Sequence, residues 1–189
     1  MRRAAPTLLA AALAAVASLP VAGSLPVAGS LPAAHASEAG LGQVPPLEAR
    51  DLDGRPVALV DSLARGPAVV TFWATWCKPC RKELPELGRL ENAYRDRGFR
   101  VFAVNGDGPV DAAKVRPYVR SGKFGFTVIP DPDGEVRRRF EVEVFPTTFL
   151  VDRDGTIVHR QVGYRRGDEK RLERALLEIL EEGAGEGSD

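Results

Sequence analysis

The chain has 189 residues, enough for one compact domain and a leader segment. Its 26 basic and 26 acidic residues give a net charge near zero. That balance leaves no basic patch that would favour nucleic acid, and no acidic block long enough to act as a charged tail. We therefore expect a globular protein with no nucleic-acid partner.

The first 36 residues are expected to form an export signal. Arg2-Arg3 supplies the positive start, and the alanine- and leucine-rich stretch 7–19 is shorter than the ~20 residues that span a bilayer. Ala34-His35-Ala36 is a small-x-small cleavage site, with a second candidate at residues 15–17. Cleavage predicts a secreted or periplasmic protein, in a compartment where disulfides persist. An uncleaved leader would instead hold the domain at the extracytoplasmic face of the membrane.

The rest of the chain alternates predicted strands and helices around a central mixed sheet, an α/β architecture. We expect this domain to occupy residues 37–182 and a disordered tail to occupy 183–189. Asp61 and Asp133 are expected to cap two short helices. In chain order, the predicted elements are a hairpin with strands at 47–51 and 56–60, a helix ending at Gly66, a strand at 69–73, a helix to about 97, a strand at 99–105, a helix at 110–121, a strand at 126–130, a helix to about 140, strands at 148–152 and 156–162, and a helix at 168–180.

The strand at 69–73 leads directly into a cysteine pair. Cys77 and Cys80 are the only cysteines and lie three residues apart. An apolar stripe follows at helical spacing, which places Cys77 at or near the N-terminus of a helix. Free N–H groups and the helix dipole stabilise an anion there, and a thiol pKa near ~8.5 typically falls to roughly 3.5–7.5 in such a setting. Cys80, one turn on, can close a disulfide with Cys77.

Two other roles for the cysteines are weaker. A structural zinc ion needs four ligands, and the chain offers two cysteines, His159 and the leader residue His35. A structural disulfide that closes so short a loop would constrain the unfolded chain very little. The pattern favours a redox pair, with no metal and no cofactor expected.

Trp76-Cys77-Lys78-Pro79-Cys80 resembles the Trp-Cys-Gly-Pro-Cys motif of thioredoxin. The segment 144–150, Val-Phe-Pro-Thr-Thr-Phe-Leu, resembles the one that carries the cis-proline of that family. The N-terminal hairpin and the helix–strand insertion within 106–131 are similar to the exported TlpA/ResA/CcmG branch. This resemblance covers roughly residues 44–182 and implies a thioredoxin-like fold.

The resemblance also implies roles for single residues. It implies a cis bond before Pro146, with the Phe145 backbone open to a substrate chain, although the Phe145 side chain could equally be core. ResA-like proteins carry a glutamate at the spacing of Glu83, where it tunes the thiols. Thioredoxin instead has a buried aspartate in its central strand, at the position of Thr71 here. Glu83 is therefore the best proton acceptor for Cys80, against the commoner reading of an exposed helix acid.

The remaining site candidates lie around the motif. Trp76 is expected in the wall of the site, Pro79 lies between the cysteines, and Lys78 either favours the Cys77 thiolate or is simply solvated. We therefore expect an exported thiol–disulfide oxidoreductase that acts as a monomer on disulfides of client proteins. The resemblance implies apocytochrome c as a client and a CcdA- or DsbD-type membrane protein as electron donor.

Two alternative functions occur on the same fold. A peroxiredoxin needs a proline and a threonine ahead of its reactive cysteine, and Ala74-Thr75-Trp76 does not fit that pattern. A copper chaperone of the Sco type carries Cys-x-x-x-Cys, a spacing that differs from the one found here.

Overall fold

The computed structural model describes residues 41–185, and the predicted leader lies outside them. Five strands form the central sheet in the order β5-β4-β3-β6-β7. β3 pairs in parallel with β4 and antiparallel with β6, so the sheet is mixed, as predicted. The bounds are β3 (Ala68–Trp73), β4 (Arg100–Asn105), β5 (Thr127–Pro130), β6 (Thr147–Val151) and β7 (Ile157–Val162).

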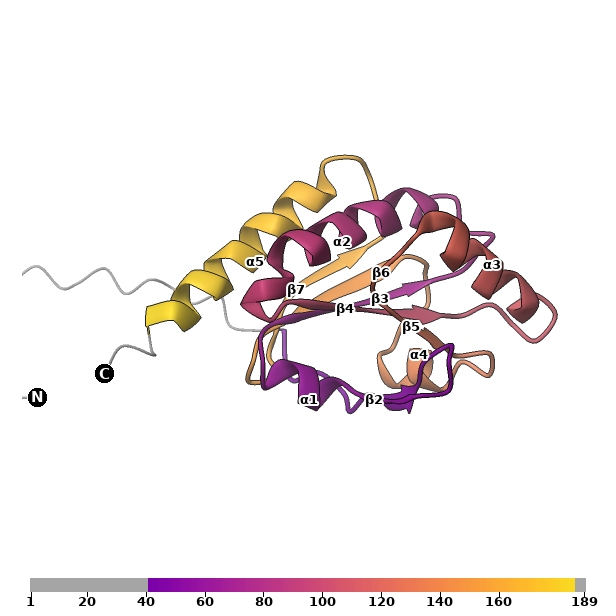
Figure 1. Cartoon of the computed structure of the whole chain (residues 1–189), viewed down its shortest axis with the longest axis horizontal. Coiled ribbons are helices and arrows are strands. Elements are labelled where there is room, and N and C mark those ends of the chain that lie inside the picture. The colour runs from indigo at the N-terminus through magenta and orange to yellow at the C-terminus, as the bar shows by residue number, and fades with distance from the viewer. Residues whose placement is uncertain (1–40, 186–189) are drawn as a thin grey trace, which may run out of the picture. The chain divides into compact units, whose positions relative to one another are not determined.

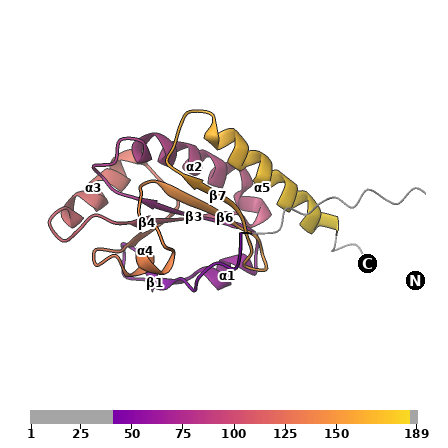
Figure 2. The ribbon, with the colours of Figure 1, turned by 180° about the vertical axis from the view of Figure 1, so that it is seen from behind.

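Helices cover both faces of this sheet (Figures 1 and 2). One face carries α2 (Cys80–Tyr94), α3 (Ala112–Gly122) and α5 (Asp168–Gly185). The other carries α1 (Leu59–Leu63), α4 (Glu135–Arg139) and the hairpin β1 (Glu48–Arg50) with β2 (Pro56–Ala58). No helix within 41–185 is long and apolar enough to cross a membrane.

Side chains of β3 alternate between two cores, as expected for a strand covered on both faces. Val69 and Trp73 pack under α2, whereas Val70 and Phe72 face α1 and α4. All six residues of β3 are buried. Thr71 falls on the α2 face, so its hydroxyl group points into a core and needs a partner there.

The hairpin and the inserted α3–β5 unit are confirmed, close to their predicted bounds. α2 continues through Pro85 and is followed by the short 3-10 helix η1 (Arg95–Arg97), which ends at Gly98 with a φ of 87°. α5 runs to Gly185, three residues into the predicted tail; residues 186–189 lie outside the described part of the chain.

Both predicted aspartate caps are wrong. Asp61 lies inside the first turn of α1, and that helix has no side-chain cap. At α4 the carboxylate that accepts backbone N–H groups belongs to Asp131, not Asp133. Asp131 is buried and accepts the N–H groups of Val136 and Arg137 from outside the helix, while Gly134, with a φ of 68°, holds the N-cap position before Glu135.

Candidate active site

The cysteine pair lies where β3 turns into α2. The first residue of α2 is Cys80, yet the Cys77 carbonyl already accepts the N–H of Arg81 at 3.2 Å, as an N-cap carbonyl does. The Cys77 Sγ accepts the N–H of Cys80, also at 3.2 Å. The sulfur therefore occupies the place of a capping oxygen, and the predicted position of Cys77 at a helix N-terminus is confirmed.

Cys77 and Cys80 form a disulfide, with their Cα atoms 5.3 Å apart. Cys77 is 4% exposed, and Cys80 at the start of α2 is fully buried. The two cysteines are therefore not equivalent, because Cys77 keeps a small exposed area and Cys80 has none.

Glu83 is buried, not the exposed helix acid of the commoner reading: only 2% of its surface is accessible. One carboxyl oxygen accepts the Thr148 hydroxyl at 2.8 Å, and the other accepts the Thr71 hydroxyl at 3.3 Å. The two hydroxyl oxygens lie 2.8 Å from each other. Glu83 is thus held in the core by a ring of contacts with Thr71 of β3 and Thr148 of β6.

These three oxygen–oxygen contacts need three hydrogens, and the two hydroxyl groups supply only two. A protonated Glu83 supplies the third and closes the ring, whereas the ionised form leaves one contact without a hydrogen. Burial raises the pKa of Glu83 to about 7, against the lowering effect of its hydrogen bonds to Thr148 and Thr71; the Asp168 charge adds to the increase. Near neutral pH this carboxyl group can therefore both give and take a proton.

An aromatic pair forms one wall of the site. The rings of Trp76 and Phe145 lie 5.9 Å apart, and Trp76 is 62% exposed. The Phe145–Pro146 peptide bond is cis, as the resemblance implied. The ring of Phe145 also packs on Gly106, where a Cβ atom would come within 2.5 Å of the ring. Phe145 is only partly buried, so its side chain is neither wholly core nor wholly free.

Lys78 and Pro79 lie on the outer side of the motif. The Lys78 side chain is exposed, and Pro79 is partly buried. Because Pro79 has no N–H group, the N–H of Cys80 is the one backbone donor that bonds the Cys77 sulfur within residues 41–185.

The sequence patterns missed Asp107, which is almost fully buried beside the motif. Its carboxylate accepts the N–H and the hydroxyl group of Thr75, each at 2.8 Å, and the amide of Asn105 at 2.7 Å. These bonds tie the turn before Cys77 to the end of β4. An aspartate between two glycines is typical of an exposed turn, so only its place after a buried strand hinted at this role.

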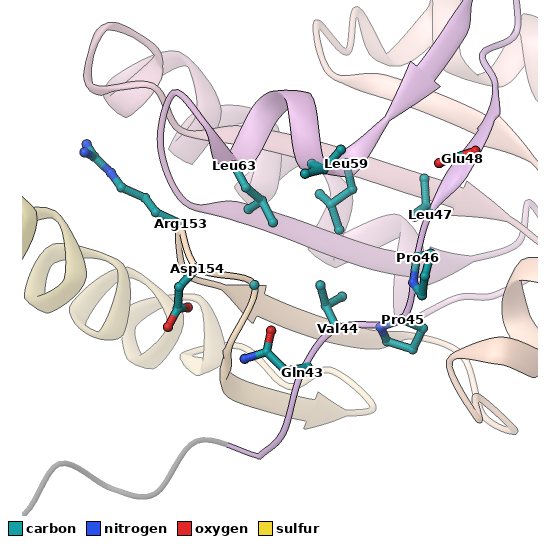
Figure 3. Close-up of a pocket in the computed structure, with 12 residues that line it drawn as sticks. Gln43, Val44, Pro45, Pro46, Leu47, Glu48, Leu59, Leu63, Arg153 and Asp154 are labelled. Carbon is teal, nitrogen blue, oxygen red and sulfur yellow. The ribbon is translucent and has the colours of Figure 1, made fainter.

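A groove of about 270 Å³ lies elsewhere (Figure 3). Figure 3 shows Val44, Leu59 and Leu63 directed into it and the Arg153 side chain extending away. The turn between β6 and β7 lines this groove. That turn follows Val151, and Val151 pairs with Ala68, the first residue of β3. The groove is therefore at the opposite end of the sheet from Cys77. Within residues 41–185, no three His, Cys, Asp or Glu side chains are placed to hold a metal ion.

Fold and site together define a class: a thioredoxin-like domain with a Cys-x-x-Cys disulfide at the start of a helix. The AhpC/TSA family model matches residues 42–160. The chain is 33% identical over 137 residues to the thiol-disulfide oxidoreductase ResA of Bacillus thuringiensis subsp. konkukian, covering 72% of this chain and 76% of that protein. It is 35% identical over 123 residues to the thioredoxin-like protein YneN of Bacillus subtilis, covering 64% and 70%.

A solved structure agrees with these relatives. A candidate thiol:disulfide interchange protein DsbE from Chlorobium tepidum superposes with a TM-score of 0.68 at 33% identity, covering 75% of this chain and 96% of that one. The chain belongs to the AhpC/TSA family of thioredoxin-fold proteins. It is a thiol–disulfide oxidoreductase, similar to ResA- and DsbE-type proteins.

Proposed function

We propose that this enzyme reduces disulfides in exported client proteins, with Cys77 as the attacking sulfur and Cys80 as the resolving one. The observation that carries this proposal is the asymmetry of the pair: the Cys77 sulfur accepts an N–H at a helix N-terminus, and Cys77 keeps a 4% exposed area, whereas Cys80 is fully buried. A helix N-terminus stabilises a thiolate, and the thiolate is the attacking species.

The reaction balances without a cofactor. The Cys77 thiolate attacks one sulfur of the client disulfide, forms a mixed disulfide and releases a client thiolate, which takes a proton from water. The Cys80 thiolate then attacks the Cys77 sulfur and releases the second client thiolate. Two electrons pass from the enzyme to the client, and the enzyme is left with the Cys77–Cys80 disulfide.

Glu83 is the proposed proton acceptor for Cys80. The two residues are three apart on α2, so their side chains are neighbours on its inward face. The Cys80 thiol must lose a proton before it can resolve the mixed disulfide, and its buried surroundings exclude bulk water. A carboxyl group with a pKa of about 7 is suited to take that proton at neutral pH.

The proposed client-binding wall consists of Trp76, Phe145 and Pro146, beside Lys78 and Pro79. Neither the N–H nor the carbonyl of Phe145 bonds to another group of the described chain, whereas the Pro146 carbonyl accepts the N–H of Gly163 at 2.7 Å. An extended client segment could therefore pair with the Phe145 backbone beside the Cys77 sulfur.

Export and the choice of client are also proposals. The leader predicted at residues 1–36 supports an extracytoplasmic location. The resemblance to the TlpA/ResA/CcmG branch supports apocytochrome c as a client and a CcdA- or DsbD-type membrane donor. The donor is required by chemistry, because a reductant in an oxidising compartment must be reduced again after each turnover.

The reduction potential tests the reductive direction. Strong oxidants such as DsbA, at roughly −120 mV, stabilise their reduced form, whereas thioredoxin lies near roughly −270 mV; the gap corresponds to about 7 kcal/mol. Here one backbone donor bonds the Cys77 sulfur, and the exposed Lys78 stabilises the reduced form by at most about 1 kcal/mol. We therefore expect a potential below roughly −200 mV, measured by equilibration with glutathione or dithiothreitol and read by tryptophan fluorescence. A value above roughly −160 mV is that of an oxidase or isomerase and would remove the reductase proposal.

A further inference from the structure

Exposed apolar side chains gather around the cysteine pair. Trp76, Val144 and Val162 are each more than half exposed. Trp76 packs beside the Phe145 ring, Val144 precedes Phe145 in the chain, and Val162 pairs with Thr147 immediately after Pro146. We call Trp76, Val144, Phe145 and Val162 the apolar platform. It lies at the end of the sheet where β3 and β7 finish and β6 begins.

Basic side chains lie on three segments at the same end of the sheet as this platform. Arg137 of α4 lies over the Phe145 ring, 5.8 Å from its centroid. Five further basic side chains at this end of the sheet are exposed. Neither these five nor the Arg137 side chain forms an ion pair with a carboxylate within residues 41–185. The basic rim consists of Lys78, Arg81 and Lys82 at the start of α2, Arg137 in α4, and Arg165 and Arg166 in the loop between β7 and α5.

Acidic side chains at the same end of the sheet do not offset this charge. Three carboxylates are exposed and have no side-chain partner within the described residues: Asp133 in the loop before α4, and Glu141 and Glu143 on the segment that leads to Phe145. The other carboxylates at this end are engaged in the fold: Asp107 with Thr75, Asp111 with Lys114, Asp168 with Arg171, and Glu169 with Tyr164. Six cations without an ion-pair partner therefore lie at this end of the sheet with three such anions.

We propose that this face binds client segments in which acidic residues flank the disulfide. The inference rests on the proposed function and names the substrate class of the same site. An apolar residue of the client packs on Trp76 and Phe145, and its carboxylates reach the basic rim. Exposed ion pairs are individually weak, so the rim acts mainly by speeding the encounter and aligning the client disulfide with Cys77, and salt screens it.

Matched peptides test this proposal. Three synthetic peptides each contain one intramolecular disulfide and one apolar residue other than tryptophan. They differ only in the residues on either side of the disulfide, which are glutamate, glutamine or lysine. The reduced protein is mixed with each, and each rate is divided by the rate at which dithiothreitol reduces the same peptide, which corrects for the reactivity of the disulfide itself. We expect the acidic peptide to react about fivefold faster than the glutamine peptide at low salt and about equally fast at high salt, with the lysine peptide slowest.

Two charge-reversal pairs locate the effect. Arg165→Glu with Arg166→Glu is expected to reduce the acidic preference to about twofold or less. Arg65→Glu with Arg153→Glu makes the same change of net charge at exposed positions at the opposite end of the sheet, and is expected to leave the preference intact. Equal loss in both pairs would mean that net charge, not this face, sets the preference.

Neutral bis(2-hydroxyethyl) disulfide separates the two levels of the proposal. If the enzyme reduces this compound but treats the three peptides alike, the acidic-client inference fails and the reductase proposal stands. If it reduces none of them, the reductase proposal itself fails. Binding to anionic phospholipid vesicles without any preference among the peptides would assign the basic rim to a membrane surface and overturn the inference.

Discussion

Cys77→Ser is expected to abolish disulfide reduction, with a rate loss of about a thousandfold or more. A serine hydroxyl group does not ionise near neutral pH, so the N–H of Cys80 would have no thiolate to stabilise and no nucleophile would face the client. The other cysteine cannot take over, because Cys80, the first residue of α2, has no exposed surface. The rate is measured as loss of client disulfide under single-turnover conditions.

Cys80→Ser is the matched control, because it removes a sulfur from the same motif. This variant keeps the attacking thiol and loses the resolving one, so the mixed disulfide between Cys77 and the client should accumulate. Intact-protein mass spectrometry without reductant detects that species. Accumulation in the Cys77→Ser variant instead, with none in Cys80→Ser, would reverse the two roles.

Glu83→Gln is expected to change stability and activity in opposite directions. The amide can accept from Thr148 and donate to Thr71, so it completes the ring of hydrogen bonds at every pH. It cannot accept the Cys80 proton. A general acid or base typically increases a reaction rate by about 10²–10⁴-fold. A thiol ionises in part without help, so it depends less on such a group, and we expect thiol exchange near pH 7 to slow about tenfold.

The stability effect depends on pH in a defined direction. The pKa of Glu83 is about 7 in the folded protein, against 4.5 for an ordinary glutamate, so below about pH 4.5 the group is protonated in both states and costs nothing. Between about 4.5 and 7 the unfolded chain releases the proton and the folded chain keeps it, which favours unfolding increasingly. Above about 7 the cost is complete, at about 3 kcal/mol for the native chain.

Glu83→Gln removes this cost, so its free energy of unfolding should exceed that of the native protein by up to about 3 kcal/mol at pH 8 and match it near pH 4. Urea titrations at the two pH values measure this difference, and Glu86→Gln serves as a control with an acid-to-amide change on the same helix. A variant that is equally stable at both pH values, with an unchanged pH–rate profile, would mean that Glu83 has only a packing role.

The sequence predicts the organisation around Cys77 well, because that organisation is local. A buried strand, a turn and a helix follow one another within 69–94, and period-2 and helical patterns identify them without knowledge of distant contacts. The helical pattern alone does not predict that Glu83 is buried, since a glutamate on a helix is usually exposed. The missing acid at Thr71 is the relevant signal in the sequence, whereas the hydrogen bond from the Thr148 hydroxyl group on β6 to Glu83 is visible only in the fold.

Features that depend on distant segments were not predicted. Asp107 is buried because β3, β4 and the turn at Thr75 converge on its carboxylate, and nothing in its neighbouring residues indicates this. The basic rim has the same origin, since it joins α2, α4 and the loop before α5. The predicted cap at Asp133 failed because the N-cap position falls on Gly134, and the carboxylate that bonds the first N–H groups of α4 comes from Asp131, next to the end of β5.

The identity of the attacking sulfur is tested most directly by alkylation of the fully reduced protein. The protein is treated at pH 7 with less than one equivalent of iodoacetamide, and the label is located by peptide mapping. Because the Cys77 sulfur lies at the helix N-terminus and Cys77 keeps some exposed area, whereas Cys80 is fully buried, we expect label at Cys77 before any appears at Cys80. Preferential labelling of Cys80 would contradict the assignment of Cys77 as the nucleophile.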